Sequence, residues 1–258
     1  MKEPKSKLAL QLYTVRDFMK TPEDTIKTLK KVKKIGYDAI QTAGYGGMDV
    51  KDFKKALDDT GLYCCATHEN LENLTKHTGK VIEEHNILEC NFTALGHPGA
   101  IKWTLAGLTK LAKQLDTAGE KLRKANIGLG YHNHAIEFQK IGNKTALEHI
   151  YSMTKNNNLQ GEIDTFWVQR GGADPVLWIN KLKGRMEVIH FKDFIIKNPQ
   201  QEIIFAEIGE GNLNWKSIIK SCKEIGIRWH IVEEDVCQRD PFKSIKISLE
   251  NLKKLGIK

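Results

Sequence analysis

The sequence predicts a (β/α)8 barrel that forms a single domain over residues 1–258, and three observations support this. The chain has 258 residues, and barrels of this kind typically use about 250 residues. Short apolar runs alternate with amphipathic stretches along the whole chain, which predicts a parallel sheet covered by helices. These runs form eight strand–helix units with no linker between them. A doubly wound open sheet is the second fold that this alternation allows.

The first four units are recognised by their apolar runs and by helix start and stop signals. Thr21 is a candidate N-cap, Pro22 suits the first helical position, and Gly36 marks the helix end. The predicted strands are residues 8–13, 39–41, 63–67 and 88–92, and the predicted helices are residues 22–36, 50–59, 71–84 and 105–124.

The last four units repeat this rhythm. Asp174 and Asp240 each precede a proline, which is a typical helix start. The predicted strands are residues 127–131, 161–164, 187–191 and 229–232, and the predicted helices are residues 145–154, 174–182, 214–224 and 241–255.

The charge and the cysteines restrict the partners and the compartment. Forty Lys and Arg residues against 32 acidic ones give a net charge of +8, but the lysines follow helical patterns typical of a solvated surface. Basic and aromatic residues do not interleave, so we expect no nucleic-acid partner. The five cysteines contain no Cys-x-x-Cys pair, which indicates small buried residues in a reducing compartment.

The chain has no membrane signal at the sequence level. No apolar run approaches the roughly 18 residues that a transmembrane helix needs, so we expect no membrane partner. The start of the sequence, residues 1–5, lacks the apolar region of a signal peptide. These features predict a cytoplasmic protein, or an exported one if the natural N-terminus was trimmed, and they leave a homo-oligomer open.

Polar residues gather where the predicted strands end. In a barrel of this class the active site lies at the carboxyl ends of the strands, so the candidate residues are those at these ends. Four consecutive strands bring histidine and carboxylate side chains to this edge, an oxygen-rich set that suits Mn²⁺, Mg²⁺, Co²⁺ or Zn²⁺. The main candidates are His68, His132, His134, Glu137, Asp164, His190, Lys192, Glu233 and Glu234.

Other chemistries have weaker signals. The sequence has no Gly-x-Ser-x-Gly, His-Glu-x-x-His or Gly-x-x-x-x-Gly-Lys motif. Gly209-Glu210-Gly211 precedes the seventh helix, where barrels often bind phosphate. Glu207 and Glu210 would repel a phosphate there, which favours a neutral sugar over a sugar phosphate, and a turn without a ligand is equally compatible.

Several of these segments together resemble a known family. They are Gln11 to Asp17, Tyr131-His132-Asn133-His134 with Glu137, Asp164-Thr165-Phe166-Trp167, His190-Phe191-Lys192-Asp193, Gly209 to Gly211, and Val232-Glu233-Glu234-Asp235. In this order they resemble the sugar phosphate isomerase/epimerase-like family of xylose-isomerase-like barrels, near the inosose dehydratases and 3-keto-glycoside epimerases. The resemblance covers nearly the whole chain.

The resemblance implies one divalent metal ion and a set of roles. Its ligands would be Glu137, Asp164, His190 and Glu233, and the two glutamates would also serve as acid and base. Glu233 and Glu234 are neighbours that point to opposite faces of a strand, so only one of them can be the ligand. We further expect Lys192 and His132 to assist catalysis. Substrate contacts are assigned to His68, His134, Trp167 and Arg170.

The expected function is that of a metal-dependent isomerase or epimerase, or a related lyase, acting on a small sugar, keto-sugar or keto-glycoside. Two alternatives remain. One is a phosphodiesterase like the DNA-repair endonucleases of the same superfamily, although Trp167 stands where those enzymes need a further histidine. The other is a barrel that binds carbohydrate without catalysis.

Overall fold

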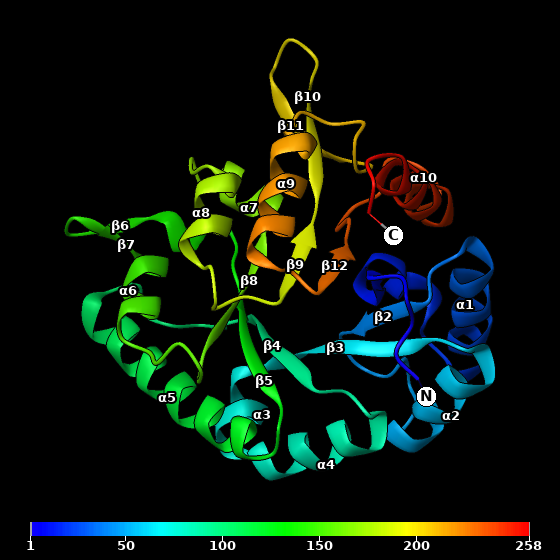
Figure 1. Ribbon diagram of the computed structural model, residues 1–258, viewed down its shortest axis with the longest axis horizontal. Coiled ribbons are helices and arrows are strands. Elements are labelled where there is room, and N and C mark those ends of the chain that lie inside the picture. Colours follow the sequence, from blue (N-terminus) through cyan, green and yellow to red (C-terminus); the bar gives the residue numbers. More distant parts are fainter. Residues whose placement is uncertain (1, 258) are drawn as a thin grey trace.

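The chain folds as a closed barrel of eight parallel strands, which confirms the predicted fold class. A computed structural model describes residues 2–257, and Figure 1 shows it along the shortest axis of the molecule. The barrel order is β1-β12-β9-β8-β5-β4-β3-β2. The strands are β1 (Leu8–Gln11), β2 (Ala39–Thr42), β3 (Tyr63–Asn70), β4 (Phe92–His97), β5 (Gly128–His132), β8 (Gln160–Asp164), β9 (Val188–Phe191) and β12 (Trp229–Val232).

Helices surround the barrel, and polar caps set their ends. Thr21 accepts a hydrogen bond from the backbone N–H of Asp24 at the start of α1, and Gly36 ends that helix in the left-handed conformation. The helices are α1 (Pro22–Ile35), α2 (Val50–Thr60), α3 (Leu71–Lys76), α4 (Thr78–Leu88), α5 (Leu105–Lys124), α6 (Ala146–Ser152), α7 (Thr165–Arg170), α8 (Pro175–Lys181), α9 (Trp215–Ile225) and α10 (Pro241–Lys254).

The barrel interior changes from apolar to polar along the strands. Successive strand residues point to opposite faces, so every second residue faces the barrel axis. Small and aromatic side chains fill the interior toward the amino ends of the strands. They include Ala9, Ala39, Phe92, Ala94 and Trp229. A larger apolar cluster packs the outer faces of the strands against the helices. The layer at the carboxyl ends of the strands carries buried polar side chains, among them Gln41, Asp164 and His190.

Some predicted elements were wrong. Strand β4 begins at Phe92, because Leu88 still belongs to α4 and Glu89 ends that helix in the left-handed conformation, where a glycine would have been recognisable. Residues 12–13 are not part of the first strand, because a 3-10 helix, η1 (Leu12–Phe18), starts at Leu12. The predicted helix 71–84 is two helices that meet at His77.

The sequence reading also missed short elements after the strands. Two hairpins, β6 (Lys140–Ile141) with β7 (Lys144–Thr145) and β10 (Asp193–Lys197) with β11 (Glu202–Ala206), leave the barrel. The second hairpin projects from the body of the protein, as Figure 1 shows. A 3-10 helix, η2 (Ile136–Phe138), follows β5.

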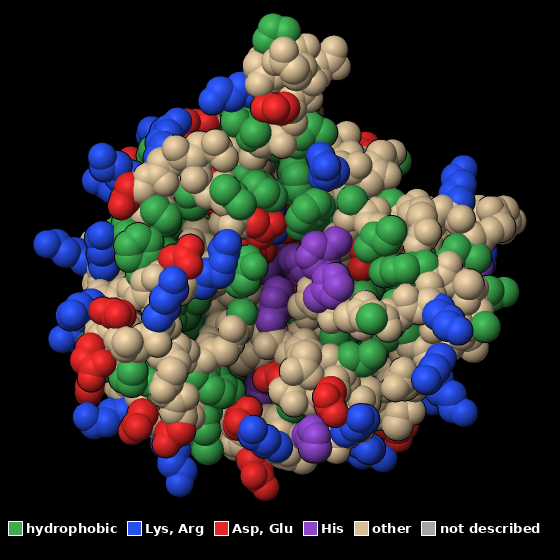
Figure 2. All heavy atoms as spheres, turned by 180° about the vertical axis from the view of Figure 1, so that it is seen from behind, with side chains coloured by type: hydrophobic (Ala, Val, Ile, Leu, Met, Phe, Trp, Pro, Cys, Tyr) green, Lys and Arg blue, Asp and Glu red, His purple; other side chains and the backbone are tan. Residues whose placement is uncertain are grey.

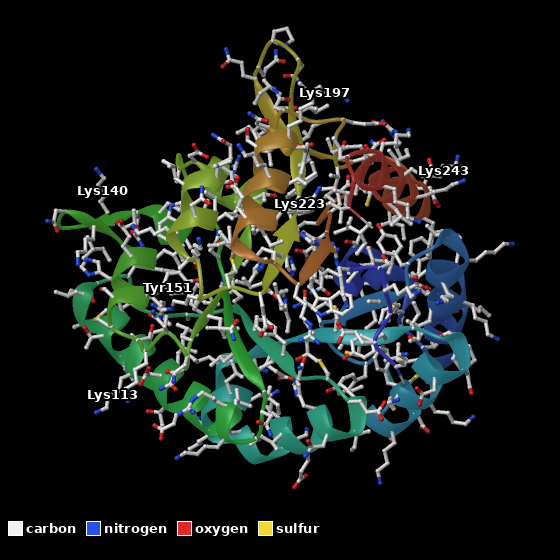
Figure 3. All side chains as sticks on the ribbon, viewed as in Figure 1. Lys113, Lys140, Tyr151, Lys197, Lys223 and Lys243 are labelled. Atoms are coloured by element: carbon white, nitrogen blue, oxygen red, sulfur yellow. The ribbon has the colours of Figure 1, made fainter. Side chains whose placement is uncertain are left out.

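The surface carries its lysines at the periphery. Lys113, Lys140 and Lys243, labelled in Figure 3, project outward from the ribbon, in line with a solvated surface charge. Figure 2 shows histidine side chains grouped in a hollow at the centre of the opposite face, with Lys and Arg mostly around the edge. Among residues 2–257, no helix combines the length and the apolar character needed to cross a bilayer.

Candidate metal and substrate site

Four buried ligand groups from four neighbouring strands meet at the carboxyl end of the barrel. They belong to His132, Asp164, His190 and Glu233, and one donor atom from each lies within 4.8 Å of the others. We call this set the outer ligand group. Oδ2 of Asp164 is buried and accepts no hydrogen bond in the described part of the chain, although the Lys192 ammonium lies 3.1 Å away. A carboxylate oxygen has more than one lone pair, so this oxygen can bind a metal ion beside Lys192.

Lys192 places its ammonium group on both carboxylates of this group. Its Nζ lies 3.1 Å from Oδ2 of Asp164, 2.9 Å from Oε2 of Glu233 and 3.0 Å from Oδ1 of Asp235. One ammonium group among three partly or fully buried carboxylates leaves an excess of negative charge, and buried charge needs compensation. A divalent cation would provide it.

The two carboxylates of the outer ligand group have pKa values that are shifted in opposite directions. Burial opposes ionisation of Glu233, but the Lys192 ammonium and the His190 imidazole outweigh it and hold the pKa of Glu233 well below its usual range. Burial dominates at Asp164 and raises its pKa to about 6, although Lys192 acts in the opposite direction. Glu233 is therefore the more firmly ionised of the two.

A second set of contacts lies beneath the outer ligand group and centres on Glu162. Oε2 of Glu162 is 2.5 Å from Nε2 of His68, and Oε1 accepts a hydrogen bond of 2.7 Å from the side-chain amide of Gln41. The same oxygen, Oε2, lies 3.5 Å from Nδ1 of His132 and 3.5 Å from Nε2 of His190. We call His68, His132, Glu162 and His190 the inner group.

His132 and His190 belong to both groups. Each ring directs one nitrogen to the outer ligand group and the other nitrogen to the inner group. His190 directs Nδ1 to Glu233 at 2.9 Å and Nε2 to Glu162. His132 directs Nε2 to Asp164 at 4.0 Å and Nδ1 to Glu162. A neutral imidazole has one lone pair, so a ring that binds a metal in the outer group offers an N–H to the inner one. The inner group is thus suited to orient the ligands of the outer group.

Glu137 lies outside both groups. Its carboxylate is fully buried and accepts hydrogen bonds from the Tyr131 hydroxyl at 3.0 Å and the backbone N–H of His134 at 2.8 Å. Glu137 belongs to η2, past the end of β5, whereas His132 is the last residue of that strand. Strand β5 thus brings His132 to the cluster, and the assignment of Glu137 as a ligand stays a prediction.

The neighbouring glutamates after β12 take different positions. Glu233 reaches His190 and Lys192, while the backbone N–H of Glu234 donates to Oγ1 of Thr14. Burial and the nearby Glu207 raise the pKa of Glu234 to about 7. The alternation of strand residues thus separates the two side chains, as expected from the sequence.

Aromatic rings line the rim on one side of the cluster. The ring of His134 lies 5.1 Å from that of His132 and 5.3 Å from that of Trp167, and Trp167 lies 6.1 Å from Phe205 on β11. His134 and Trp167 therefore lie where substrate contacts were expected. Arg170 is exposed at the end of α7, and the structure does not bring it to this rim.

The glycine-rich turn before α9 closes on a carboxylate of the protein itself. Asp193 accepts hydrogen bonds from the backbone N–H groups of Gly209, Gly211 and Leu213, at 3.0, 3.1 and 3.2 Å, and from the indole of Trp215 at 2.5 Å. A Cβ on Gly211 would lie 2.2 Å from Oδ1 of Asp193, so this position requires glycine. The N–H groups that could have held a phosphate are occupied.

Glu162, Gln41 and Gln11 were missed by the sequence analysis, although a signal for one of them was present. Glu162 precedes Asp164 by two residues on the same strand, so both must face the barrel axis. Gln11, whose amide donates to Oε1 of Gln41 at 2.9 Å, entered the sequence analysis only as the first residue of the segment Gln11 to Asp17. Gln41 lies within a short predicted strand, and the sequence did not distinguish it from a surface residue.

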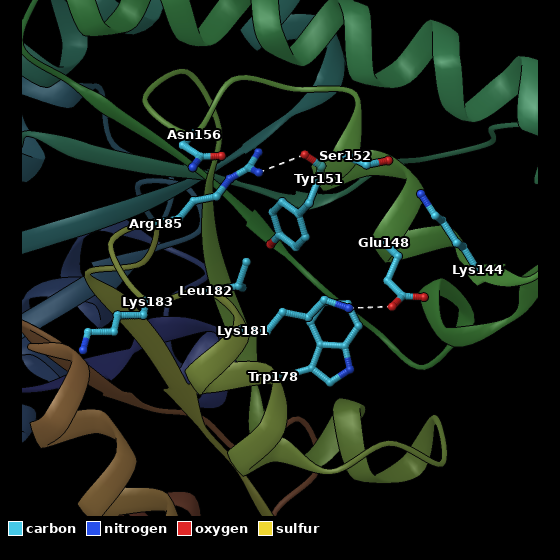
Figure 4. A pocket seen from close by; sticks show the side chains of 10 residues that line it. All are labelled: Lys144, Glu148, Tyr151, Ser152, Asn156, Trp178, Lys181, Leu182, Lys183 and Arg185. Carbon is cyan, nitrogen blue, oxygen red and sulfur yellow. Dashed lines mark hydrogen bonds and ion pairs between the residues drawn. The ribbon is translucent and has the colours of Figure 1, made fainter.

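A separate cavity on the outside of the barrel, between α6 and α8, does not belong to this site. It has a volume of about 310 Å³ and is lined by Tyr151, Trp178 and Arg185, among others (Figure 4). Arg185 donates to the backbone carbonyl groups of Leu159 and Tyr151 at 2.7 and 2.8 Å. Its guanidinium therefore joins the end of α6 to the segment before β8.

The fold and the site together define a (β/α)8 barrel with a buried histidine–carboxylate centre at the carboxyl ends of its strands. The chain belongs to the Xylose isomerase-like TIM barrel family, whose model matches residues 29–255.

Three relatives illustrate the range of this fold. The chain is 25% identical over 150 residues to an inosose dehydratase of Lacticaseibacillus casei, a match that covers 52% of this chain and 50% of the relative. The chain thus spans about half the length of the curated relatives it matches. A sugar phosphate isomerase/epimerase from Parabacteroides distasonis superposes with a TM-score of 0.84 at 24% identity, covering 99% of this chain and 96% of the other. An L-ribulose 3-epimerase superposes with a TM-score of 0.74 at 15% identity, covering 97% and 94%.

Proposed function

We propose that this protein is a divalent-metal-dependent enzyme that removes a proton next to the carbonyl group of a keto-sugar or keto-glycoside. The observation that carries the proposal is the outer ligand group, which combines two imidazoles and two carboxylates in a buried setting. This mixed nitrogen and oxygen set suits Mn²⁺, Co²⁺ or Zn²⁺ better than Mg²⁺, which prefers oxygen alone. His132, Asp164, His190 and Glu233 would hold the ion. When bound, it supplies Lewis-acid stabilisation of negative charge on the carbonyl oxygen.

The residues around the ion provide the proton chemistry. We assign removal of the proton to Glu233, because it is an ionised carboxylate of the outer ligand group and contacts His190 and Lys192. The Lys192 ammonium faces the same space and stabilises an oxyanion that forms there. We assign His68 to the departing oxygen. Its Nε2 faces the buried Glu162, so Nδ1, which lies 3.4 Å from the side-chain amide nitrogen of Gln11, would carry the proton and would turn from that amide to the departing oxygen. Trp167 and His134 form the wall against which a sugar ring can pack.

The position of Glu137 favours elimination over epimerisation within this class. Epimerisation that uses two carboxylates needs one on each side of the substrate, and Glu233 belongs to the outer ligand group whereas Glu137 is bonded to Tyr131. In an elimination, Glu233 takes the proton from the carbon next to the carbonyl group. The electron pair of the broken C–H bond then forms a carbon–carbon double bond. The β-oxygen leaves with a proton from His68, and water or an alcohol is lost. The named activity of the inosose dehydratase relatives agrees with this choice.

The test is solvent exchange at the carbon next to the carbonyl group. Protein loaded with Mn²⁺ is incubated in D₂O with a panel of keto-sugars and keto-glycosides, and proton NMR follows the loss of that signal and any released alcohol. Glu233→Gln should reduce exchange by about 10² or more, while Glu234→Gln keeps it. A folded Glu233→Gln protein with full activity would contradict the proposal. Sugar binding without exchange would favour a non-catalytic barrel.

A further inference from the structure

The cavity between α6 and α8, with a volume of about 310 Å³, has no role in the function proposed above. It is large enough for a small organic molecule, because pockets for such ligands typically measure about 300–1,000 Å³. None of its lining residues belongs to the outer ligand group or to the inner group. The lining has an aromatic part, formed by Tyr151 and Trp178, and a basic part, formed by Lys144, Lys181, Lys183 and Arg185.

The aromatic part of the lining offers flat apolar surface. The ring centroids of Tyr151 and Trp178 lie 6.5 Å apart, with planes at 45°, and Figure 4 shows the Tyr151 ring between Arg185 and Trp178. Trp178 also packs edge to face on Phe138, with centroids 5.5 Å apart. Leu182 adds a further apolar side chain to the lining. Because aromatic rings pack favourably on one another, this part favours a planar occupant.

The Tyr151 hydroxyl provides a specific polar group in the lining. Tyr151 is only 7% exposed, and its hydroxyl has no hydrogen-bond partner among residues 2–257. Burial raises the pKa of this hydroxyl, so it stays protonated and can donate a hydrogen bond. Buried polar atoms are normally paired. An occupant with an oxygen acceptor at this point would supply the partner.

The basic part gives the cavity a surplus of positive charge. Four basic side chains line the cavity with one carboxylate, Glu148. Glu148 is already bonded to Lys181 at 2.5 Å and to the backbone N–H of Thr145 at 2.8 Å. Lys144 and Lys183 are exposed and form no ion pair with a carboxylate of residues 2–257. Such a surplus attracts an anion.

We propose that this cavity binds an aromatic carboxylate, with its ring against Trp178, its carboxylate at the lysines of the basic part and a second oxygen at the Tyr151 hydroxyl. Each part of the ligand then meets one part of the lining. A neutral aromatic molecule would leave the lysines without an anion, and an aliphatic acid would leave the aromatic part without a planar partner. The inference does not depend on the function proposed above, because the two sites share no residue.

Calorimetry on the Mn²⁺-loaded protein measures the binding of three probes. The first, 4-hydroxybenzoate, has the ring, the carboxylate and the second oxygen. The second, 4-hydroxybenzyl alcohol, lacks the charge, and the third, 4-hydroxycyclohexanecarboxylate, lacks the planar ring. We expect a Kd of about 1 mM or less for 4-hydroxybenzoate and values at least about tenfold higher for the other two. Equal Kd values for the three probes, or no binding of 4-hydroxybenzoate, would overturn the proposal.

Two changes in the lining locate the binding. Tyr151→Phe keeps the ring and removes the hydroxyl, so it should raise the Kd of 4-hydroxybenzoate about tenfold. Lys144→Gln combined with Lys183→Gln should also raise it about tenfold and bring the affinities for the acid and the alcohol closer together. The matched controls, Tyr63→Phe on β3 and Lys140→Gln on β6, lie outside the lining and should leave the Kd unchanged.

The same variants distinguish this cavity from the reaction centre, where a carboxylate can bind a metal ion. A Kd that rises in both lining variants, and not in the controls or on removal of Mn²⁺ with EDTA, would support the proposal. An unchanged Kd in Tyr151→Phe or in the lysine variant would overturn it. Binding that is lost with EDTA and kept in both lining variants would place the probe at the outer ligand group instead.

Discussion

Oε1 of Gln41 lies 2.5 Å from Nε2 of His190, and this contact fixes how the histidine can act. The Gln41 amide donates to Glu162, a carboxylate that only accepts when ionised, so the carbonyl oxygen of Gln41 faces His190. Nε2 of His190 must then carry a proton. The lone pair of the neutral ring is left on Nδ1, the nitrogen that faces Glu233 in the outer ligand group.

Replacement of Gln41 should therefore weaken metal binding. Gln41→Leu removes the acceptor that holds the ring of His190, and loss of such a partner typically costs about 10–100-fold in metal affinity. Titration with Co²⁺, followed by visible absorption, measures the affinity and the ligand field together. Gln160→Leu is the matched control, because Gln160 lies at the opposite end of the barrel on β8. Equal Co²⁺ affinity in the two folded variants would contradict this role.

Much of the fold followed from the sequence because the strand–helix alternation is regular. The predicted strand 229–232 and the helix 105–124 match the structure at both ends. Elements that follow the strands were missed because they have no period of their own. The β10–β11 hairpin begins at Asp193. Its apolar residues have the pattern of a core strand, so the sequence does not distinguish the hairpin from the barrel strand before it.

The candidate site was predicted less completely, and Glu137 shows why. A motif that matches a family identifies a position along the chain. Whether the side chain at that position reaches the cluster depends on where the strand ends. Strand β5 ends at His132, so the barrel axis receives an imidazole and Glu137 turns to Tyr131. Gln41 and Glu162 were missed because their importance comes from the contact between β2 and β8 residues across the barrel.

Asp193 should stabilise the turn before α9 as an anion. Asp193→Asn places an amide N–H₂ group against donors from Gly209, Gly211 and Trp215, so at least one buried donor loses its partner. We expect a loss of about 2–4 kcal/mol in the free energy of unfolding, measured by urea denaturation. The control Asp59→Asn, in an exposed ion pair with Lys55, should change it by less than about 0.5 kcal/mol. Equal stability of the two variants would refute this role.

His230 should make the protein less stable in mild acid. It is buried on β12 with its ring 5.2 Å from that of Phe191, and burial lowers its pKa from 6.5 to about 4. As the pH falls below 6.5 the unfolded chain gains this proton first, so stability declines between pH 6.5 and about 4 and this contribution then levels off. The full difference is about 3 kcal/mol at 1.36 kcal/mol per pKa unit.

Urea unfolding between pH 7.5 and 4.5 measures how the free energy of unfolding depends on pH. His230→Leu should remove the contribution of His230 to this dependence, while His77→Leu, at an exposed position, keeps it. An identical slope in His230→Leu and the wild type would show that His230 is accessible to protons in the folded protein.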